Sequence, residues 1–100
     1  MERQFKLFGR KTCEVCRKVK GKVEYFLNRW HVTTPLVCYD VDEPEGMAEG
    51  AWYDVVEIPT VVLEEGEKII GRWQEKPPLL QELRTIFGIS DTGQPVPEET

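Results

Sequence analysis

The 100-residue chain is long enough for one small domain, and its 40% hydrophobic content is that of a soluble protein with a modest core. No run of about 18 apolar residues is present, and residues 1–10 lack the apolar stretch of a signal peptide, so we expect no membrane segment and a cytoplasmic location. The net charge of -5 argues against nucleic acid as a partner.

The charge is unevenly distributed along the chain. Residues 1–30 carry nine Lys/Arg against three Asp/Glu, whereas residues 31–100 carry four against fifteen. The basic segment contains Cys13 and Cys16, two of the three cysteines. In a cytoplasmic protein such a Cys-x-x-Cys pair binds a metal or performs redox chemistry more often than it staples the fold. The positive charge is either a solvated helix face or a field over the cysteines.

The first elements follow from hydrophobic periodicity. Residues 4–9 alternate apolar and polar side chains and predict a strand. Residues 13–30 predict a helix with Thr12 as its N-cap. Its apolar stripe consists of Cys16, Val19, Val23, Phe26, Leu27 and Trp30. The apolar run at residues 36–41 predicts a strand buried on both faces, which makes Cys38 a buried, inert thiol.

A short second helix is expected after this strand. Asp42 can cap it, Glu45 can complete a capping box, and Pro44 suits the first turn. We expect its apolar residues to share a buried face, with Trp52, like Trp30, in the core. These residues are Met47, Ala48, Ala51, Trp52 and Val55.

The remaining elements are a hairpin and a last helix. Residues 58–63 and 68–73 predict two strands joined by a turn at 64–67. Pro77 and Pro78 open a helix that Gly88 ends. The apolar stripe of this helix consists of Leu79, Leu80, Leu83, Ile86 and Phe87. We expect an α/β fold of order β-α-β-α-β-β-α over residues 1–89, a four-stranded mixed sheet with helices on both faces, and a disordered tail at 90–100.

Three motifs carry a resemblance to a known family. Cys13-Glu14-Val15-Cys16 directly follows the first predicted strand, Ile58-Pro59-Thr60 enters the third, and Gly71 stands at the end of the fourth. With these motifs, residues 4 to 88 resemble the thioredoxin-like superfamily in its compact, glutaredoxin-sized form. The resemblance implies a thioredoxin-like fold, thiol–disulfide oxidoreductase activity, a role in cell redox homeostasis, and a cis peptide bond before Pro59 that faces the cysteine pair.

The helix start explains how the pair could work. Unpaired N–H groups and the helix dipole favour a thiolate at Cys13, and the cations Lys11 and Arg17 add to that effect. Cys16 lies one turn further on, so the two sulfurs can join. We expect Cys13 to attack and Cys16 to resolve the mixed disulfide. The expected substrate-binding residues are Thr12, Ile58, Pro59, Thr60 and Gly71.

The expected partners are disulfide-containing proteins, together with a reductase or a low-molecular-weight thiol as electron donor. We expect a monomer with no metal and with no cofactor beyond the redox-active Cys13–Cys16 disulfide. Two alternatives stay open. One is a non-catalytic binding module with the same fold. The other is a metal site, either zinc with His31 and Cys38 as further ligands or a [2Fe–2S] cluster shared between two copies through Cys13. Trp73 either borders the site or packs in the core.

Overall fold

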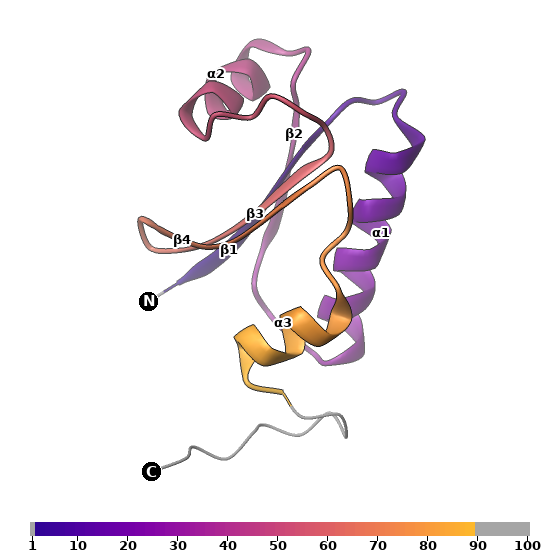
Figure 1. Cartoon of the computed structure of the whole chain (residues 1–100), viewed down its shortest axis with the longest axis vertical. Coiled ribbons are helices and arrows are strands. Elements are labelled where there is room, and N and C mark those ends of the chain that lie inside the picture. The colour runs from indigo at the N-terminus through magenta and orange to yellow at the C-terminus, as the bar shows by residue number, and fades with distance from the viewer. Residues whose placement is uncertain (1, 90–100) are drawn as a thin grey trace.

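A computed structural model describes residues 2–89, so the predicted tail at 90–100 lies outside the described residues. The chain follows the predicted order, which is thus confirmed (Figure 1). Its elements are β1 (Arg3–Gly9), α1 (Glu14–Arg29), β2 (Leu36–Asp40), α2 (Pro44–Trp52), β3 (Thr60–Glu65), β4 (Lys68–Gln74) and α3 (Leu80–Phe87). None of the helices within residues 2–89 is long and apolar enough to cross a membrane.

The four strands form one mixed sheet in the order β2-β1-β3-β4. β1 pairs in parallel with β2, whereas β3 is antiparallel to both β1 and β4. Gly9 pairs with Asp40, and Thr60 pairs with both Phe8 and Gln74. The ends of β1, β2 and β4 and the start of β3 therefore meet at one edge of the sheet, which we call the Gly9 edge.

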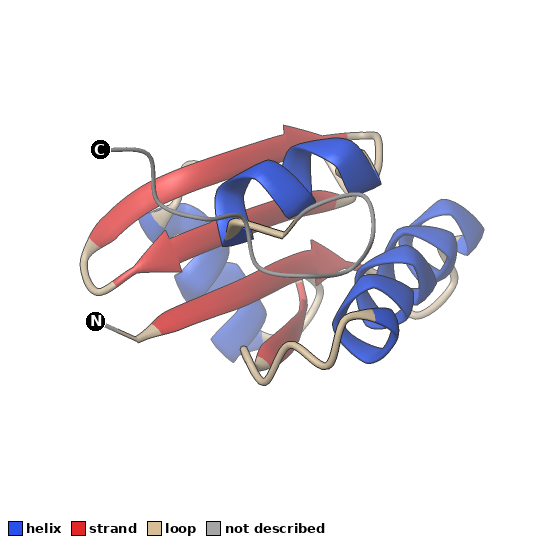
Figure 2. Ribbon diagram, turned by 90° about the horizontal axis from the view of Figure 1, so that it is seen from below, coloured by secondary structure: helices blue, strands red, loops and turns tan. Residues whose placement is uncertain are grey.

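Helices cover both faces of the sheet, as predicted. Figure 2 shows α1 and α3 on one face and α2 behind the other. The larger core lies under α1 and α3 and is built on Phe5, Leu7, Val61 and Leu63 of the central strands. On the opposite face, Phe8 and Val62 pack with Tyr53, which directly follows α2. The alternation of side chains along β1 thus supplies both cores.

The predicted buried face of α2 is wrong. Gly46 and Gly50 are its buried residues, while Met47 is 54% exposed and Trp52 81% exposed, so Trp52 is not a core residue. A Cβ atom at Gly46 would collide with the backbone carbonyl of Asp40, and one at Gly50 would lie 3.9 Å from the Phe8 ring. The helix therefore approaches the sheet through its glycines, and its apolar stripe turns outward.

The predicted cap of α2 is also wrong. Pro44 does occupy the first turn, but Glu43 is the N-cap and makes no side-chain hydrogen bond there. The Asp42 carboxylate instead accepts two hydrogen bonds from Nε of Arg10, at 3.0 and 3.1 Å. The predicted capping box with Glu45 is consequently absent.

The prediction that β2 is buried on both faces is wrong as well. Because β3 pairs with the other side of β1, β2 becomes an outer strand of the sheet. Cys38 is an exposed residue, which corrects its assignment as a buried thiol. Partial desolvation of its sulfur still raises the pKa of Cys38, and the charge of nearby Lys20 opposes that rise.

The C-terminal half follows the predictions more closely. The hairpin forms, although β3 continues to Glu65 and the turn tightens to Gly66 and Glu67. Gly88 ends α3 in the left-handed conformation at φ 67°. The two prolines precede α3, and Leu79 is its N-cap at 63% exposure, so Leu79 is not part of the buried stripe. The other members of that stripe pack in or against the larger core, as does Trp30.

A polar cluster ties α2 to the sheet. Nζ of Lys6 on β1 donates to the Tyr53 hydroxyl at 2.8 Å and lies 3.2 Å from Oε1 of Glu64. The Tyr53 hydroxyl in turn donates to the Glu64 carboxylate. Burial alone would lower the pKa of Lys6, but the hydrogen bonds to Tyr53 and Glu64 outweigh it and raise that pKa overall. The cluster satisfies a charge that would otherwise be costly to bury.

We expect Gly46→Ala and Gly21→Ala to change stability in opposite directions. The Cβ at position 46 meets the Asp40 backbone, so the free energy of unfolding should fall by about 1–3 kcal/mol. Gly21 lies within α1 with nothing within 4 Å of an added Cβ, so alanine there should add up to about 1 kcal/mol through helix propensity. Urea unfolding of both variants measures these changes. If the two variants were equally stable, Gly46 would not be required for the close approach of α2 to Asp40.

Candidate functional site

The first turn of α1 is built around the two cysteines. Cys13 is the N-cap, with extended backbone at φ -89° and ψ 110°. Its Sγ accepts a hydrogen bond from the Cys16 backbone N–H at 3.1 Å. The sulfur thereby takes the place that a serine or threonine oxygen usually fills in a helix cap. The prediction of Thr12 as the N-cap is therefore wrong by one residue, and Thr12 is exposed beside Cys13.

The structure joins Cys13 and Cys16 in a disulfide with a Cα–Cα distance of 5.2 Å. That distance lies within the range of about 4.4–6.8 Å that disulfides accept. Cys16 is only 4% exposed and belongs to the buried side of α1, whereas Cys13 is half-buried. Cys13 is accordingly the cysteine that a second molecule can approach.

Gly9 makes room for the buried sulfur. A Cβ atom at this position would lie 2.9 Å from both Cβ and Sγ of Cys16. Contacts that short force a neighbour to move, so only glycine leaves Cys16 in its place. The sequence alone marks Gly9 as the end of a strand. Its contact with Cys16 depends on how α1 packs on β1, and no local pattern reveals that.

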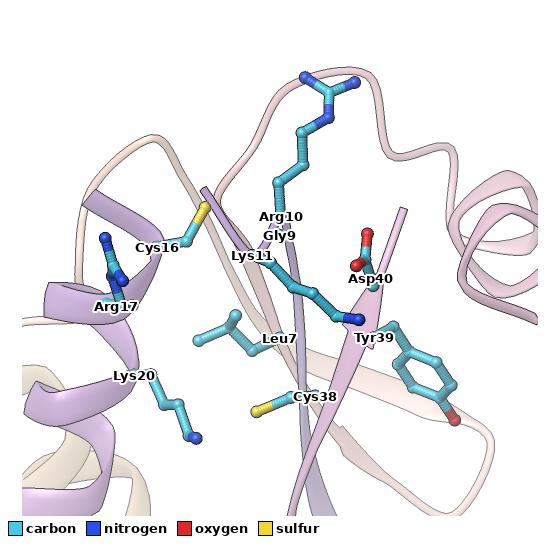
Figure 3. A pocket seen from close by; sticks show the side chains of 10 residues that line it. All are labelled: Leu7, Gly9, Arg10, Lys11, Cys16, Arg17, Lys20, Cys38, Tyr39 and Asp40. Carbon is cyan, nitrogen blue, oxygen red and sulfur yellow. The ribbon is translucent and has the colours of Figure 1, made fainter. Parts of the chain in front are cut away.

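Four cationic residues line a cavity beside Cys16; in Figure 3, Lys11 extends toward Asp40, whereas the Arg10 guanidinium points away from the cavity. Arg10 and Lys11 come from the loop after β1, and Arg17 and Lys20 come from α1. Arg10 is paired with Asp42, and Nζ of Lys11 lies 3.3 Å from Oε1 of Glu43. The predicted tuning residue Lys11 is therefore partly neutralised, whereas the Arg17 side chain makes no hydrogen bond or ion pair within residues 2–89.

The Ile58-Pro59-Thr60 motif reaches the same edge of the sheet as the cysteines. The Ile58–Pro59 peptide bond is cis. Thr60 pairs with Phe8, so Pro59 lies next in register to Gly9, which itself contacts Cys16. Thr60 is fully buried, and its hydroxyl donates to the Glu57 carbonyl at 2.6 Å, which anchors the loop before the strand.

Gly71 has a different place from the one predicted. It lies in the middle of β4, paired with Leu63, and not at the end of the strand. A Cβ atom at Gly71 would collide with the indole of Trp73, so the space it leaves is already filled. We therefore assign Gly71 to packing. Trp73 is 6% exposed and belongs to the larger core.

The described residues do not assemble the ligands of a zinc site. Within residues 2–89, no group of three or more His, Cys, Asp or Glu side chains is placed to hold a metal ion. His31 follows the C-terminal end of α1, whose 16 residues separate it from Cys13 by about 24 Å of helix. His31 therefore cannot join the cysteine pair in one coordination sphere.

No family model and no curated protein sequence matches the chain. Solved structures of thioredoxins do match it. Thioredoxin from Fasciola hepatica is 25% identical at a TM-score of 0.63, covering 85% of this chain and 77% of that one. Thioredoxin 1 from Thermosipho africanus is 21% identical at 0.64, covering 82% and 86%. Oxidized mitochondrial thioredoxin 3 from Saccharomyces cerevisiae is 19% identical at 0.64, covering 84% and 74%.

These likenesses, together with the four-stranded mixed sheet, define the chain as a protein of the thioredoxin fold. Within this fold, the chain carries a Cys-x-x-Cys pair at the start of its first helix. The predicted resemblance to this superfamily is confirmed for the fold.

In the reduced protein we expect the pKa of the Cys13 thiol to lie below that of a free cysteine. The Cys16 N–H, the helix start and the Arg17 charge all favour the thiolate, while Glu14 opposes it. Ultraviolet absorbance of the thiolate against pH measures this in Cys38→Ser, with Cys13→Ser/Cys38→Ser as the control. A pKa equal to or above that of a free cysteine would contradict the expectation.

Proposed function

We propose that the protein is a thiol–disulfide oxidoreductase that reduces protein disulfides through Cys13 and Cys16. The observation that supports this most directly is the first turn of α1. There Cys13 caps the helix, and its sulfur accepts a hydrogen bond from the Cys16 backbone N–H. The sulfur of the buried Cys16 is joined to the sulfur of Cys13 in a disulfide. An accessible sulfur with a built-in hydrogen-bond donor and a partner sulfur within reach is what thiol exchange requires.

The proposed reaction has two exchange steps. The Cys13 thiolate attacks one sulfur of the substrate disulfide, the substrate S–S bond breaks, and the leaving sulfur takes up a proton. Cys16 then loses its proton and attacks Cys13, which releases the second substrate thiol and forms the Cys13–Cys16 disulfide seen in the structure. Two electrons and two protons pass to the substrate, and a reductase or a low-molecular-weight thiol must return them.

The Gly9 edge would hold the substrate. Thr12 is exposed beside Cys13, and Ile58 precedes the buried Pro59, so an extended substrate segment could run between them. Thr60 acts differently from the other predicted binding residues. Because its buried hydroxyl is used by the Glu57 carbonyl, Thr60 would position the loop and not touch the substrate.

The test is an insulin-reduction assay with dithiothreitol, thioredoxin reductase or glutathione as parallel electron donors. Cys13→Ser should lower the rate to that of the donor alone. Cys16→Ser should accumulate a mixed disulfide between Cys13 and the substrate, because resolution is lost. The donor that sustains the wild-type rate identifies the recharging partner.

Cys38→Ser is the matched control, since it removes a thiol outside the pair and should keep the mixed-disulfide chemistry. Full activity in both Cys13→Ser and Cys16→Ser would remove the assigned roles. A folded wild-type protein that reduces nothing with any donor would favour the non-catalytic binding module.

A further inference from the structure

A cavity of about 230 Å³ opens beside the cysteine pair, between α1 and β2. Leu7, Gly9 and Tyr39 contribute to it from the sheet, and Cys16 borders it from the helix. In Figure 3, Arg17 and Lys20 stand on one side and Asp40 on the other. The cavity is smaller than the roughly 300–1,000 Å³ of pockets that enclose drug-sized ligands. It is suited to a side chain presented by a larger partner.

The cavity carries uncompensated positive charge. Its lining includes four cations and one acid, Asp40, whose carboxylate already accepts the Asp42 N–H at 2.9 Å. Arg10 and Lys11 have ion pairs with acidic residues of the loop before α2. Arg17 and Lys20 stand one turn apart on α1, and their side chains form no hydrogen bond or ion pair within the part of the chain that the structure describes.

The opposite side of the Gly9 edge carries negative charge. Glu57 precedes the Ile58–Pro59 bond, and the Glu75 N–H donates to the Pro59 carbonyl at 2.7 Å. The neighbouring Glu57 carboxyl raises the pKa of Glu75. The edge is thus polarised, with cations over α1 and β2 and carboxylates over the start of β3 and the end of β4.

Building on the proposed function, we infer that the preferred substrates are protein disulfides with acidic residues on one side of the attacked cysteine. One of these carboxylates enters the cavity and pairs with Arg17 and Lys20. A substrate cysteine joined to Cys13 would place its chain neighbours over this surface on one side and over Glu57 and Glu75 on the other. An acidic residue therefore strengthens substrate binding when it lies on one side of the cysteine and weakens binding when it lies on the other side.

The experiment compares three short peptides that carry one cysteine as a mixed disulfide with a coloured thiol. The first has two Glu before the cysteine, the second has two Glu after it, and the third has Gln at all of these positions. Each rate is divided by the rate with dithiothreitol, which removes intrinsic differences between the disulfides. We expect kcat/KM for one acidic isomer to exceed that for the neutral peptide about three- to tenfold, and the other isomer to show no gain.

Two matched double variants locate the effect. In Arg17→Gln/Lys20→Gln, the ratio of kcat/KM for the preferred acidic peptide to kcat/KM for the neutral peptide should fall close to one. A change in the reactivity of Cys13 would affect both peptides equally and cancels in this ratio. Lys18→Gln/Lys22→Gln removes the same charge from α1, but these lysines border a separate groove next to Pro77 and Pro78. This control should keep the preference.

Equal normalised rates for the three peptides with wild-type protein would overturn the inference. A similar gain for both acidic isomers, or an equal loss of preference in both double variants, would also overturn it, because a diffuse positive field would then be the cause. Failure to reduce any peptide would overturn the proposed function itself. Reduction of the neutral peptide without any preference would leave that function standing.

Discussion

The site depends on one hydrogen bond, from the Cys16 backbone N–H to the sulfur of Cys13. It starts α1, because an N-cap acceptor satisfies a donor that the helix leaves unpaired. It also places the accessible sulfur one turn from the buried one. Gly9 of β1 leaves the space that Cys16 occupies, since any larger residue there would push Cys16 out of position. Fold and proposed chemistry therefore share a single turn of backbone.

The electrostatics of the site follow from the strand order. Parallel pairing of β1 with β2 brings the basic loop after β1 next to the start of the acidic segment that leads into α2. Antiparallel pairing of β1 with β3 brings Pro59 and the carboxylates of Glu57 and Glu75 to the same edge. Because Arg10 and Lys11 form ion pairs, Arg17 and Lys20 are the cavity cations whose side chains have no ion pair among the described residues. The basic first third of the sequence thus becomes a local feature of the site.

The sequence predicted what periodicity and turn chemistry control. The stripe of α1, the hairpin and the left-handed end of α3 at Gly88 follow such local rules. It failed where packing decides. Hydrophobic spacing could not show that α2 would bury its glycines and expose Trp52, because the close approach of Gly46 to β2 is a tertiary contact. Strand order likewise decides that Cys38 lies on an outer strand and not in the interior.

The cysteine turn and the Pro59 loop lie more than 40 residues apart in the chain, and the pairing of β1 with β3 is what holds them in register. Six residue pairs span this seam, from Arg3 with Glu65 to Phe8 with Thr60. If the register between β1 and β3 shifted, the cysteine turn and the Pro59 loop could each keep its local geometry but would no longer lie next to each other. Damage far from either cysteine, in the middle of the sheet, would therefore separate the reactive sulfur from the loop that presents its target.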